Sequence, residues 1–403
     1  MKKIASATLL FLLIATSKLS GGGFETNTKT VSVTGMAGAQ VAVPQSSSSA
    51  VYNPAAIGFL PKKMMFSAGI SGLISKTSYF ETGTENYHSA HPSRFLPSVS
   101  ATFQINERIG AGLAYYSSFG YHHRWEDNWP GRFVTIESKL GIKTIQPSVS
   151  FTFAEMFAVS ASALIHNGNY DHRKALATGN NEGEASLNGK GSGMGFMLGS
   201  FLKYNESLSA GLTIKWNGNL NLKNSTLAYS RIPSSWQDLY PVVDAFDITI
   251  RLPYCVTAGA SITFNEDLIT TAELSYSGWK RLDSLYFSSP VADGGPVYLR
   301  LNNSLSGRLG VQYAFVEEFI MKGGVTYEVS PYNSDHVIPS YPDANKVSFA
   351  LGAEFKPKPQ FSVDVAAGLE NVFERKGVDA DNYFYGSYNS TRYFFGAGIN
   401  YHF

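Results

Sequence analysis

Two kinds of side chain alternate along short segments through most of this chain. In SLSAGLTIKW (residues 207–216), every second residue is apolar, and Ser, Gly, Thr and Lys occupy the positions between. FSVDVAAGLE (361–370) has the same period, with Asp and Glu among the intervening residues. A period of two belongs to a β-strand whose two faces meet different surroundings. The pattern therefore predicts strands with one face in an apolar medium and the other beside charges.

The connections between these segments alternate in length. We place about fourteen segments, starting near residues 63, 94, 108, 143, 156, 190, 207, 246, 268, 303, 319, 346, 360 and 392. Tight turns are predicted near residues 106, 154, 205, 265, 316 and 358. Longer connections are predicted at about 76–93, 121–141, 168–189, 220–245, 280–302, 329–345 and 371–391. Short turns at one end and long loops at the other are typical of outer-membrane barrels, and closure leaves no unpaired edge in hydrocarbon. We therefore predict an all-β, membrane-spanning antiparallel barrel of about 14 strands.

Both ends of the chain carry signals of export and assembly. Lys2 and Lys3 precede a short apolar run and then small residues, a pattern that predicts a cleaved signal peptide over residues 1–22. The run is too short for a membrane-spanning helix. The last segment, RYFFGAGINYHF, alternates and ends in Phe403. A terminal aromatic of this kind is typical of barrels that the assembly machinery recognises, although a soluble edge strand would look similar.

Composition excludes several other classes of protein. The formal net charge is +1 and only 16% of residues are charged, so there is no basic face for nucleic acid. Cys255 is the single cysteine, which excludes an intramolecular disulfide and a cysteine-based metal site. His122 and His123 are neighbours that would point to opposite strand faces. We expect no metal and no cofactor.

The segment SSSSAVYNPAAIGFLPKK (46–63) precedes the first strand and does not alternate. Asn53 suits a helix N-cap, Pro54 suits the first helical position, and Pro61 would end the helix. A short helix from Pro54 to about Phe59 follows. Such a segment is also compatible with a surface turn, but a barrel this wide has space that its strands do not fill. We favour packing of this segment, including the serine run, against the inner face of the barrel.

Four blocks spread over the chain support a resemblance to a known family. They are GMAGAQVAVPQSSSSAVYNPAAIGFL, RIGAGLAYYSSFGYHHRWEDNWPGRF, LPYCVTAGASITFNEDLITTAELSYSGWKRLDSL and GGVTYEVSPYNSDHVIPSYPDANKVSFALGAEF. With these blocks in this order, the chain resembles the FadL/TodX-type outer-membrane transporters of long-chain fatty acids and other hydrophobic molecules. The resemblance implies a fourteen-stranded barrel closed by an N-terminal hatch, with Asn53, Pro54 and Ala55 as the hatch motif. It divides the chain into a signal (1–22), a hatch (23–61) and a barrel (62–403).

The resemblance also implies two functional regions. An inward kink in the third strand opens the wall of family members, and the matching residues are Ser117, Ser118, Phe119 and Gly120. External loops three and four form an apolar capture groove in the family, and they correspond to about 168–189 and 220–245. The second loop supplies the apolar candidates Leu227, Ile232, Trp236, Leu239, Tyr240, Val242 and Val243. The first loop is more polar, which departs from the family pattern.

Charged residues on the inner face leave two interpretations open. Alternation directs Lys215, Arg308 and Lys322 inward. Glu273, Glu354 and Asp364 are expected on the same inner face. A lysine or arginine there could bind the carboxylate of a ligand. The same residues could instead form a network of paired charges that braces the barrel.

The main functional hypothesis is a passive transporter in the outer membrane of a Gram-negative-type bacterium, acting as a monomer. A hydrophobic ligand would be captured outside, held beside the hatch and released sideways into membrane lipid. The alternative is a general diffusion porin for small polar solutes, which requires an open lumen. A barrel enzyme is a third class, but His166 with Asn167 is the one tempting pair and no serine matches it. We expect no enzymatic activity.

Overall fold

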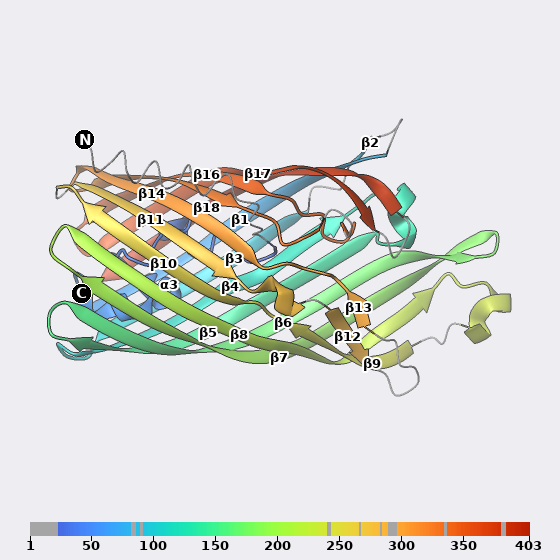
Figure 1. The fold of residues 1–403 in the computed structure, drawn as a ribbon, viewed down its shortest axis with the longest axis horizontal. Coiled ribbons are helices and arrows are strands. Elements are labelled where there is room, and N and C mark those ends of the chain that lie inside the picture. The colour runs from blue at the N-terminus through green and yellow to red at the C-terminus, as the bar shows by residue number, and fades with distance from the viewer. Residues whose placement is uncertain are drawn as a thin grey trace.

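The protein is a long closed β-barrel (Figure 1). The computed structural model describes residues 23–81, 86–88, 92–239, 243–265, 267–282, 284–288, 296–333, 337–379 and 384–403. The wall consists of β1 (Met64–Phe80), β3 (Ser93–Gln104), β4 (Ile109–Arg124), β5 (Glu137–Phe153), β6 (Phe157–Thr178), β7 (Asn181–Lys203), β8 (Leu208–Ser230), β9 (Val243–Arg251), β10 (Tyr254–Thr263), β11 (Leu268–Ser277), β14 (Ser304–Val316), β15 (Phe319–Glu328), β16 (Lys346–Lys358), β17 (Phe361–Asp379) and β18 (Phe384–His402). In the described part of the chain, β9 and β10 both pair with β8 and act as one strand, so the antiparallel wall has fourteen strands and closes where β1 pairs with β18. The predicted fold class is confirmed.

Short elements lie in the connections at one end of the barrel, to the right in Figure 1. They are β2 (Asn86–His88), η2 (Pro130–Phe133), η3 (Ser234–Leu239), η4 (Trp279–Leu282), β12 (Ser284–Ser288) and β13 (Pro296–Tyr298). Within the described residues, no helix has the length and apolarity needed to cross a bilayer.

The tight turns are confirmed, but two predicted loops, 168–189 and 371–391, are wrong, and a third, 220–245, is largely strand. Gaps of two to four residues separate the wall strands at each predicted tight turn, for example between β3 and β4 and between β10 and β11. The stretch 168–189, however, is not a loop, because β6 runs to Thr178 and β7 begins at Asn181. The two strands continue as a paired hairpin beyond the rest of the wall (Figure 1). Likewise, β17 runs to Asp379 and β18 begins at Phe384. β8 runs to Ser230 and β9 begins at Val243. Above the membrane both faces of a strand meet water, so the apolar alternation that marks a strand disappears while the pairing continues.

Strand alternation separates an apolar outer face from a polar inner face. On β5 the exposed residues Ile145, Val149 and Phe151 alternate with the buried residues Gln146 and Ser150. The most exposed apolar side chains include Leu351 at 71% and Met194 at 69%. An outer face of this composition is stable in hydrocarbon and unstable in water. The wall therefore matches a lipid-facing barrel with a polar lumen.

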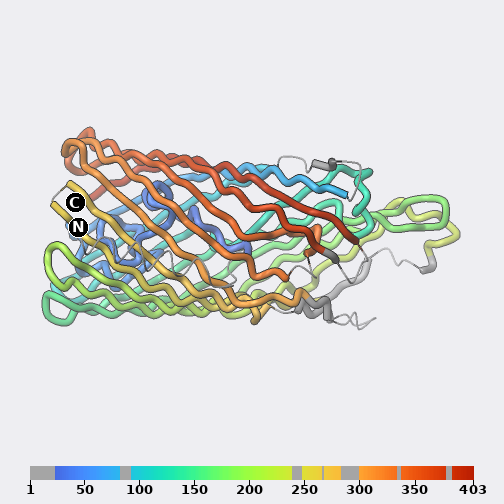
Figure 2. Tube along the Cα trace, turned by 45° about the horizontal axis from the view of Figure 1, so that its top comes forward, coloured from blue at the N-terminus to red at the C-terminus, as the bar shows by residue number. Residues whose placement is uncertain are grey.

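The N-terminal segment, residues 23–60, lies inside the barrel, where it contains α2 (Val31–Thr34), α3 (Ser49–Tyr52) and η1 (Pro54–Phe59). The dark blue trace in Figure 2 is enclosed by the wall strands. The predicted cap is confirmed, because the Asn53 side chain accepts a hydrogen bond from Ala55 N at 3.2 Å. The serine run packs on the inner face, with Ser47 Oγ 2.6 Å from Ser67 Oγ and 2.8 Å from Ser100 Oγ.

Polar groups of the wall anchor this segment along its length. Lys322 Nζ donates to Ser32 O at 3.2 Å and pairs with Glu354 at 3.0 Å and Asp364 at 2.9 Å. Asn53 Nδ2 donates to Val41 O at 2.9 Å and to Ser200 O of β7 at 3.0 Å. Lys322 thus supplies a donor from the wall to a carbonyl of the segment, and Asn53 supplies one from the segment to a carbonyl of the wall, so neither buried carbonyl is left unpaired.

The seam of the barrel holds α2 through glycines. Gly69 of β1 pairs with Gly398 of β18, where the first and last strands meet. A Cβ at Gly69 would lie 2.8 Å from Val31 Cγ2, and one at Gly398 would lie 3.3 Å from Val31 Cβ. The absence of side chains at these positions lets Val31 rest directly on the seam.

We predict that Asn53→Ala destabilises the folded protein. The change removes the η1 cap and leaves the carbonyls of Val41 and Ser200 without this donor, at a cost of about 1–3 kcal/mol. Guanidinium unfolding in detergent, followed by tryptophan fluorescence, measures the free energy of unfolding. Asn188→Ala, at an exposed position on β7, is the control and should change it little. Equal stability of the two variants would contradict the anchoring role.

Candidate functional site

The wall is interrupted where β3 and β4 separate. The two strands pair from Gln104 opposite Gly110 to Val99 opposite Tyr115. Beyond that point, in the residues that the structure describes, β3 pairs with β1 alone and β4 with β5 alone. We call the space between Ser93–Ser98 and Tyr116–Arg124 the β3–β4 gap. It exposes two strand edges that a barrel wall normally pairs.

A bulge in β4 accompanies the gap. The register between β4 and β5 shifts between Ser117 and Phe119, which leaves Ser118 as the extra residue. Gly120 follows with φ of +152°, a conformation that other residues adopt at a cost in energy. The four residues proposed from the sequence as a kink, Ser117 to Gly120, therefore lie together at the bulge.

The N-terminal segment covers the exposed edge of β4. Thr26 N donates to Ser118 O at 3.0 Å, and Gly120 N donates to Phe24 O at 2.8 Å. Glu25 and Phe119 form an antiparallel bridge between these two bonds. Residues 24–26 thus take the hydrogen-bonding place that β3 has left. From the opposite side of the gap, Arg94 Nη1 donates to Gly120 O.

A cavity lies directly behind the gap. It encloses about 870 Å³ of empty space, part of which is open to solvent. Both edges of the gap border it, through Arg94 and Leu96 of β3 and Gly120 to His123 of β4. Its apolar lining includes Phe24, Leu73, Leu96 and Phe394. We call this space the gap cavity.

Two arginines bring uncompensated donors to the gap cavity. Arg392 Nη1 pairs with Glu370 Oε1 at 2.7 Å, whereas its Nη2 is buried without a hydrogen-bond partner. Arg94 has no carboxylate within 4.0 Å among the described residues, and its Nη1 bonds a neutral carbonyl. Guanidinium groups in this state are suited to binding an anionic oxygen.

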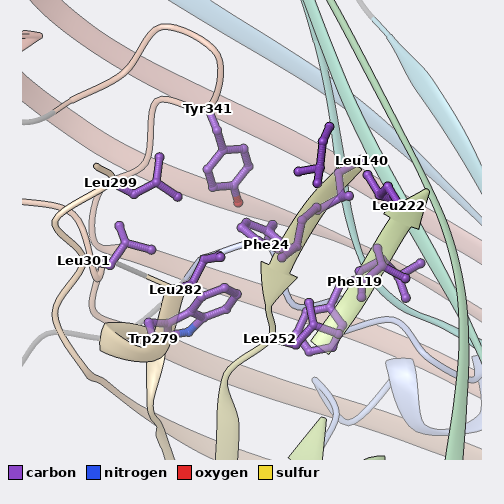
Figure 3. Close-up of a cluster of buried hydrophobic side chains, with 14 of the residues drawn as sticks. Phe24, Phe119, Leu140, Leu222, Leu252, Trp279, Leu282, Leu299, Leu301 and Tyr341 are labelled. Carbon is purple, nitrogen blue, oxygen red and sulfur yellow. The ribbon is translucent and has the colours of Figure 1, made fainter. Parts of the chain in front are cut away.

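Phe24 lines the gap cavity and is held in place by other aromatic rings. Its ring packs edge-to-face against Trp279, Tyr341 and Phe119, with centroids 4.8, 5.9 and 6.2 Å away, as Figure 3 shows. The preceding carbonyl, Gly23 O, accepts hydrogen bonds from Tyr341 Oη at 2.7 Å and Lys346 Nζ at 3.1 Å. Burial raises the pKa of Tyr341, so its hydroxyl remains a protonated donor at neutral pH.

Glu25 forms an ion pair that connects the N-terminal segment to the wall. Its carboxylate lies 2.7 Å from Lys29 Nζ and 3.2 Å from Lys215 Nζ. Burial acts to raise the pKa of Glu25, but the charges of Lys29 and Lys215 outweigh burial and lower it. Glu25 is therefore ionised, and any outward movement of residues 24–26 has to break these ion pairs.

The three lumen cations proposed from the sequence point inward but do not border the gap cavity. Lys215 and Arg308 border a second, more polar cavity of about 710 Å³, which also contains Glu273 and Glu328. Lys322 is enclosed by two carboxylates and Ser32 O. In the geometry observed, Lys215 and Lys322 brace the N-terminal segment, and Arg308 Nη2 donates to Asn27 Oδ1 at 3.3 Å.

The residues proposed for external capture have several environments. Leu227 lies within β8, not in a loop, and packs beside the cluster that contains Phe24, because β8 continues well beyond the membrane. Ile232 and Trp236 are half-buried near the tip of the β6–β7 hairpin, close to Gly183 and Gly179 respectively. Leu239 ends η3 and Val243 begins β9. Tyr240 and Val242 lie outside the described residues.

Arg94, Arg392 and Phe24 were missed by sequence reasoning. Alternation offered a signal, because Arg94 and Arg392 lie on strands at inward positions, but the pattern cannot identify which inward charge lacks a partner. The pair considered for an enzyme is divided by the same alternation: His166 is buried with Nδ1 2.8 Å from Thr144 Oγ1, whereas Asn167 is exposed on the outer face.

Comparison with known proteins places these features in a family context. Residues 12–403 match the sequence model of the family described as "Outer membrane protein transport protein (OMPP1/FadL/TodX)". Outer membrane protein P1 of Haemophilus influenzae is 21% identical over 316 residues, which cover 70% of this chain and 67% of that protein.

Two solved structures have the same fold. A FadL homologue from Pseudomonas aeruginosa superimposes with a TM-score of 0.84 at 19% identity, over 95% of this chain and 100% of the other. The toluene transporter TodX of P. putida gives a TM-score of 0.71 at 16% identity, over 96% of this chain and 99% of the other.

We predict that Phe24→Ala loosens the cover of the gap. The variant loses the packing against Trp279, Tyr341 and Phe119, and a Phe→Ala change in a packed site costs about 3–5 kcal/mol. Backbone amide exchange of residues 24–28 should accelerate at least about tenfold. Phe59→Ala, which removes the contact with Phe201 elsewhere in the segment, is the control and should leave residues 24–28 protected. Unchanged exchange in the Phe24 variant would show that the hydrogen bonds to β4 hold the segment without the ring.

Proposed function

Because the chain belongs to the outer membrane protein transport family (OMPP1/FadL/TodX), a family of outer-membrane transporters of hydrophobic compounds, we propose that it takes up long-chain fatty acids or similar amphipaths by passive transport. The observation that carries the proposal is the gap cavity, which combines apolar walls with the unpartnered Nη2 of Arg392 and with Arg94. A carboxylate headgroup bound between these arginines would complete their hydrogen bonds. The acyl chain would lie along Leu73, Leu96 and Phe394.

The proposed route ends at the β3–β4 gap. A ligand captured at the external end, near Ile232 and Trp236, would enter the gap cavity and displace Phe24 and its neighbours from the β4 edge. It would then pass between β3 and β4 into the hydrocarbon of the membrane. The edges of the gap support this route, because a polar opening in a lipid-facing wall is tolerated where it lines a cavity.

The remaining expectations belong to the same proposal. Residues 1–22 act as a cleaved signal, residues 23–61 as the hatch and residues 62–403 as the barrel, with the Asn53, Pro54 and Ala55 motif holding the hatch. The assembly machinery recognises Phe403. The protein acts as a monomer, without a cofactor, a nucleic-acid partner or enzymatic activity. A diffusion porin is disfavoured because residues 31–60 occupy the lumen and are largely buried.

We predict that Arg94→Gln selectively weakens the binding of acids. The affinity for oleate, measured by isothermal titration calorimetry in detergent, should fall about tenfold or more, because a hydrogen bond to a charged group contributes about 1.5–3 kcal/mol. The affinity for oleyl alcohol, which has the same chain without the charge, should stay unchanged. Arg124→Gln, at an exposed position on β4, the opposite edge of the gap, is the control. Equal losses for both ligands would indicate that Arg94 shapes the cavity and does not bind a carboxylate.

We predict that deletion of Ser118 blocks release while it preserves binding. Removing the extra residue restores a regular register between β4 and β5 and favours closure of the wall. Oleate delivery to vesicle lipid should be lost, while oleate affinity in detergent is retained. Ser118→Ala keeps the bulge and should transport normally. Delivery by the deletion variant at the normal rate would rule out exit through the β3–β4 gap.

A further inference from the structure

The outer face of the barrel changes from apolar to basic along β5 and β7. On β5, the exposed residues Val149 and Ile145 are followed on the same face by Lys143 and Lys139, which are also exposed. On β7, exposed Lys190 lies on the same face as exposed Met194, four residues nearer the start of the strand. These three lysines lie on the side of the apolar residues away from the short turns, which is the external side in a barrel of this type.

Strand register brings the lysines around β6. Lys143 is opposite Asn167, and Lys190 is opposite Asn169. Asn169 is also opposite Gly141, midway between the two lysines of β5. Opposed residues in antiparallel strands are about 5 Å apart, so the flexible side chains of all three lysines can reach a common group above β6. We call Lys139, Lys143, Lys190, Asn167 and Asn169 the β5–β7 lysine patch.

Gly141 leaves an open space at the centre of the lysine patch. Gly141 has no side chain, and Asn169 Oδ1 lies 3.1 Å from the position that a Cβ at Gly141 would occupy. The amide of Asn169 therefore lies over the space between Lys139 and Lys143.

Acidic residues near the patch do not neutralise it. Asp171, opposite Lys139, accepts a hydrogen bond from Asn169 Nδ2 at 3.0 Å. Glu137 is next along the face and lies 2.8 Å from His122 Nε2 and 3.8 Å from Arg173 Nη2. Within the part of the chain that the structure describes, no carboxylate is within 4.0 Å of an ammonium group of Lys139, Lys143 or Lys190. The patch keeps a positive charge that lacks a protein partner.

The position of the β5–β7 lysine patch relative to the apolar outer face indicates which kind of molecule binds it. Lys143 is two residues beyond Ile145, or about 7 Å along the strand. Ile145 is the last exposed apolar residue of β5 on this face, so a hydrocarbon boundary at Ile145 places Lys143 and Lys139 at the depth of the lipid headgroups. Basic residues at this depth bind anionic lipid headgroups. We propose that the β5–β7 lysine patch binds the phosphate groups of a glycolipid in the outer leaflet of the outer membrane.

The test compares lipid binding by the mature protein and by a triple variant, Lys139→Gln, Lys143→Gln and Lys190→Gln. Native mass spectrometry in detergent titrates bisphosphorylated lipid A, and dephosphorylated lipid A is titrated in parallel. The control variant, Lys62→Gln, Lys63→Gln and Lys358→Gln, removes the same charge from exposed positions at the opposite end. Heat-modifiable migration on gels verifies that each barrel is folded.

Binding of bisphosphorylated lipid A should weaken about tenfold or more in the triple variant, since each lysine near an anionic headgroup contributes about 1 kcal/mol. The control variant should bind normally, and the loss should be absent with dephosphorylated lipid A. Excess inorganic phosphate should compete only weakly, because it lacks the acyl chains that hold the headgroup at this depth. The proposal is overturned by unchanged binding, by an equal loss in the control, or by an equal loss with the dephosphorylated lipid.

Discussion

Every backbone amide and carbonyl at membrane depth needs a partner within the protein, because hydrocarbon offers none. Closure of β1 on β18 meets that requirement around most of the wall. The β3–β4 gap is the exception among the described strands, and the structure compensates for it from inside. Residues 24–26 bond the edge of β4, and Arg94 reaches across to Gly120. Three residues of an interior segment therefore complete the hydrogen bonding of the wall.

The lumen divides into two regions with different chemistry. Around α2 and η1, ion pairs and amide contacts such as those of Lys322 and Asn53 leave little freedom for movement. Around residues 23–26, aromatic packing and two lysine partners of Glu25 hold the chain beside a cavity. The first region is suited to permanent closure. The second combines empty space, the unpartnered Nη2 of Arg392 and backbone groups that bond the β4 edge.

Local rules predicted much of the fold but less of the site. Alternation and turn residues predicted the strands, and the Asn53 cap was readable because a cap depends on residues two or three positions away. The hairpin over residues 168–189 was mistaken for a loop because its strands have water on both sides. The importance of Phe24 and Arg94 depends on contacts between residues far apart in the chain, including Trp279 and Gly120. The alternation of one sequence predicts which charged side chains point inward, but not which of them lacks a partner, because the partners come from distant parts of the chain.

The seam glycines bear on the order in which the molecule is assembled. Val31 rests on Gly69 and Gly398, which belong to the first and last strands of the wall. The seam cannot form until β18 has been made, and once formed it encloses the segment that was made before β1. The interior segment, which is synthesised before the wall strands, is thus enclosed only when the last strand pairs. Pairing of β1 with β18 is therefore also the step that encloses the interior segment. If the segment is inside when these strands pair, the barrel contains it; if it is outside, the same step gives a barrel with an empty lumen.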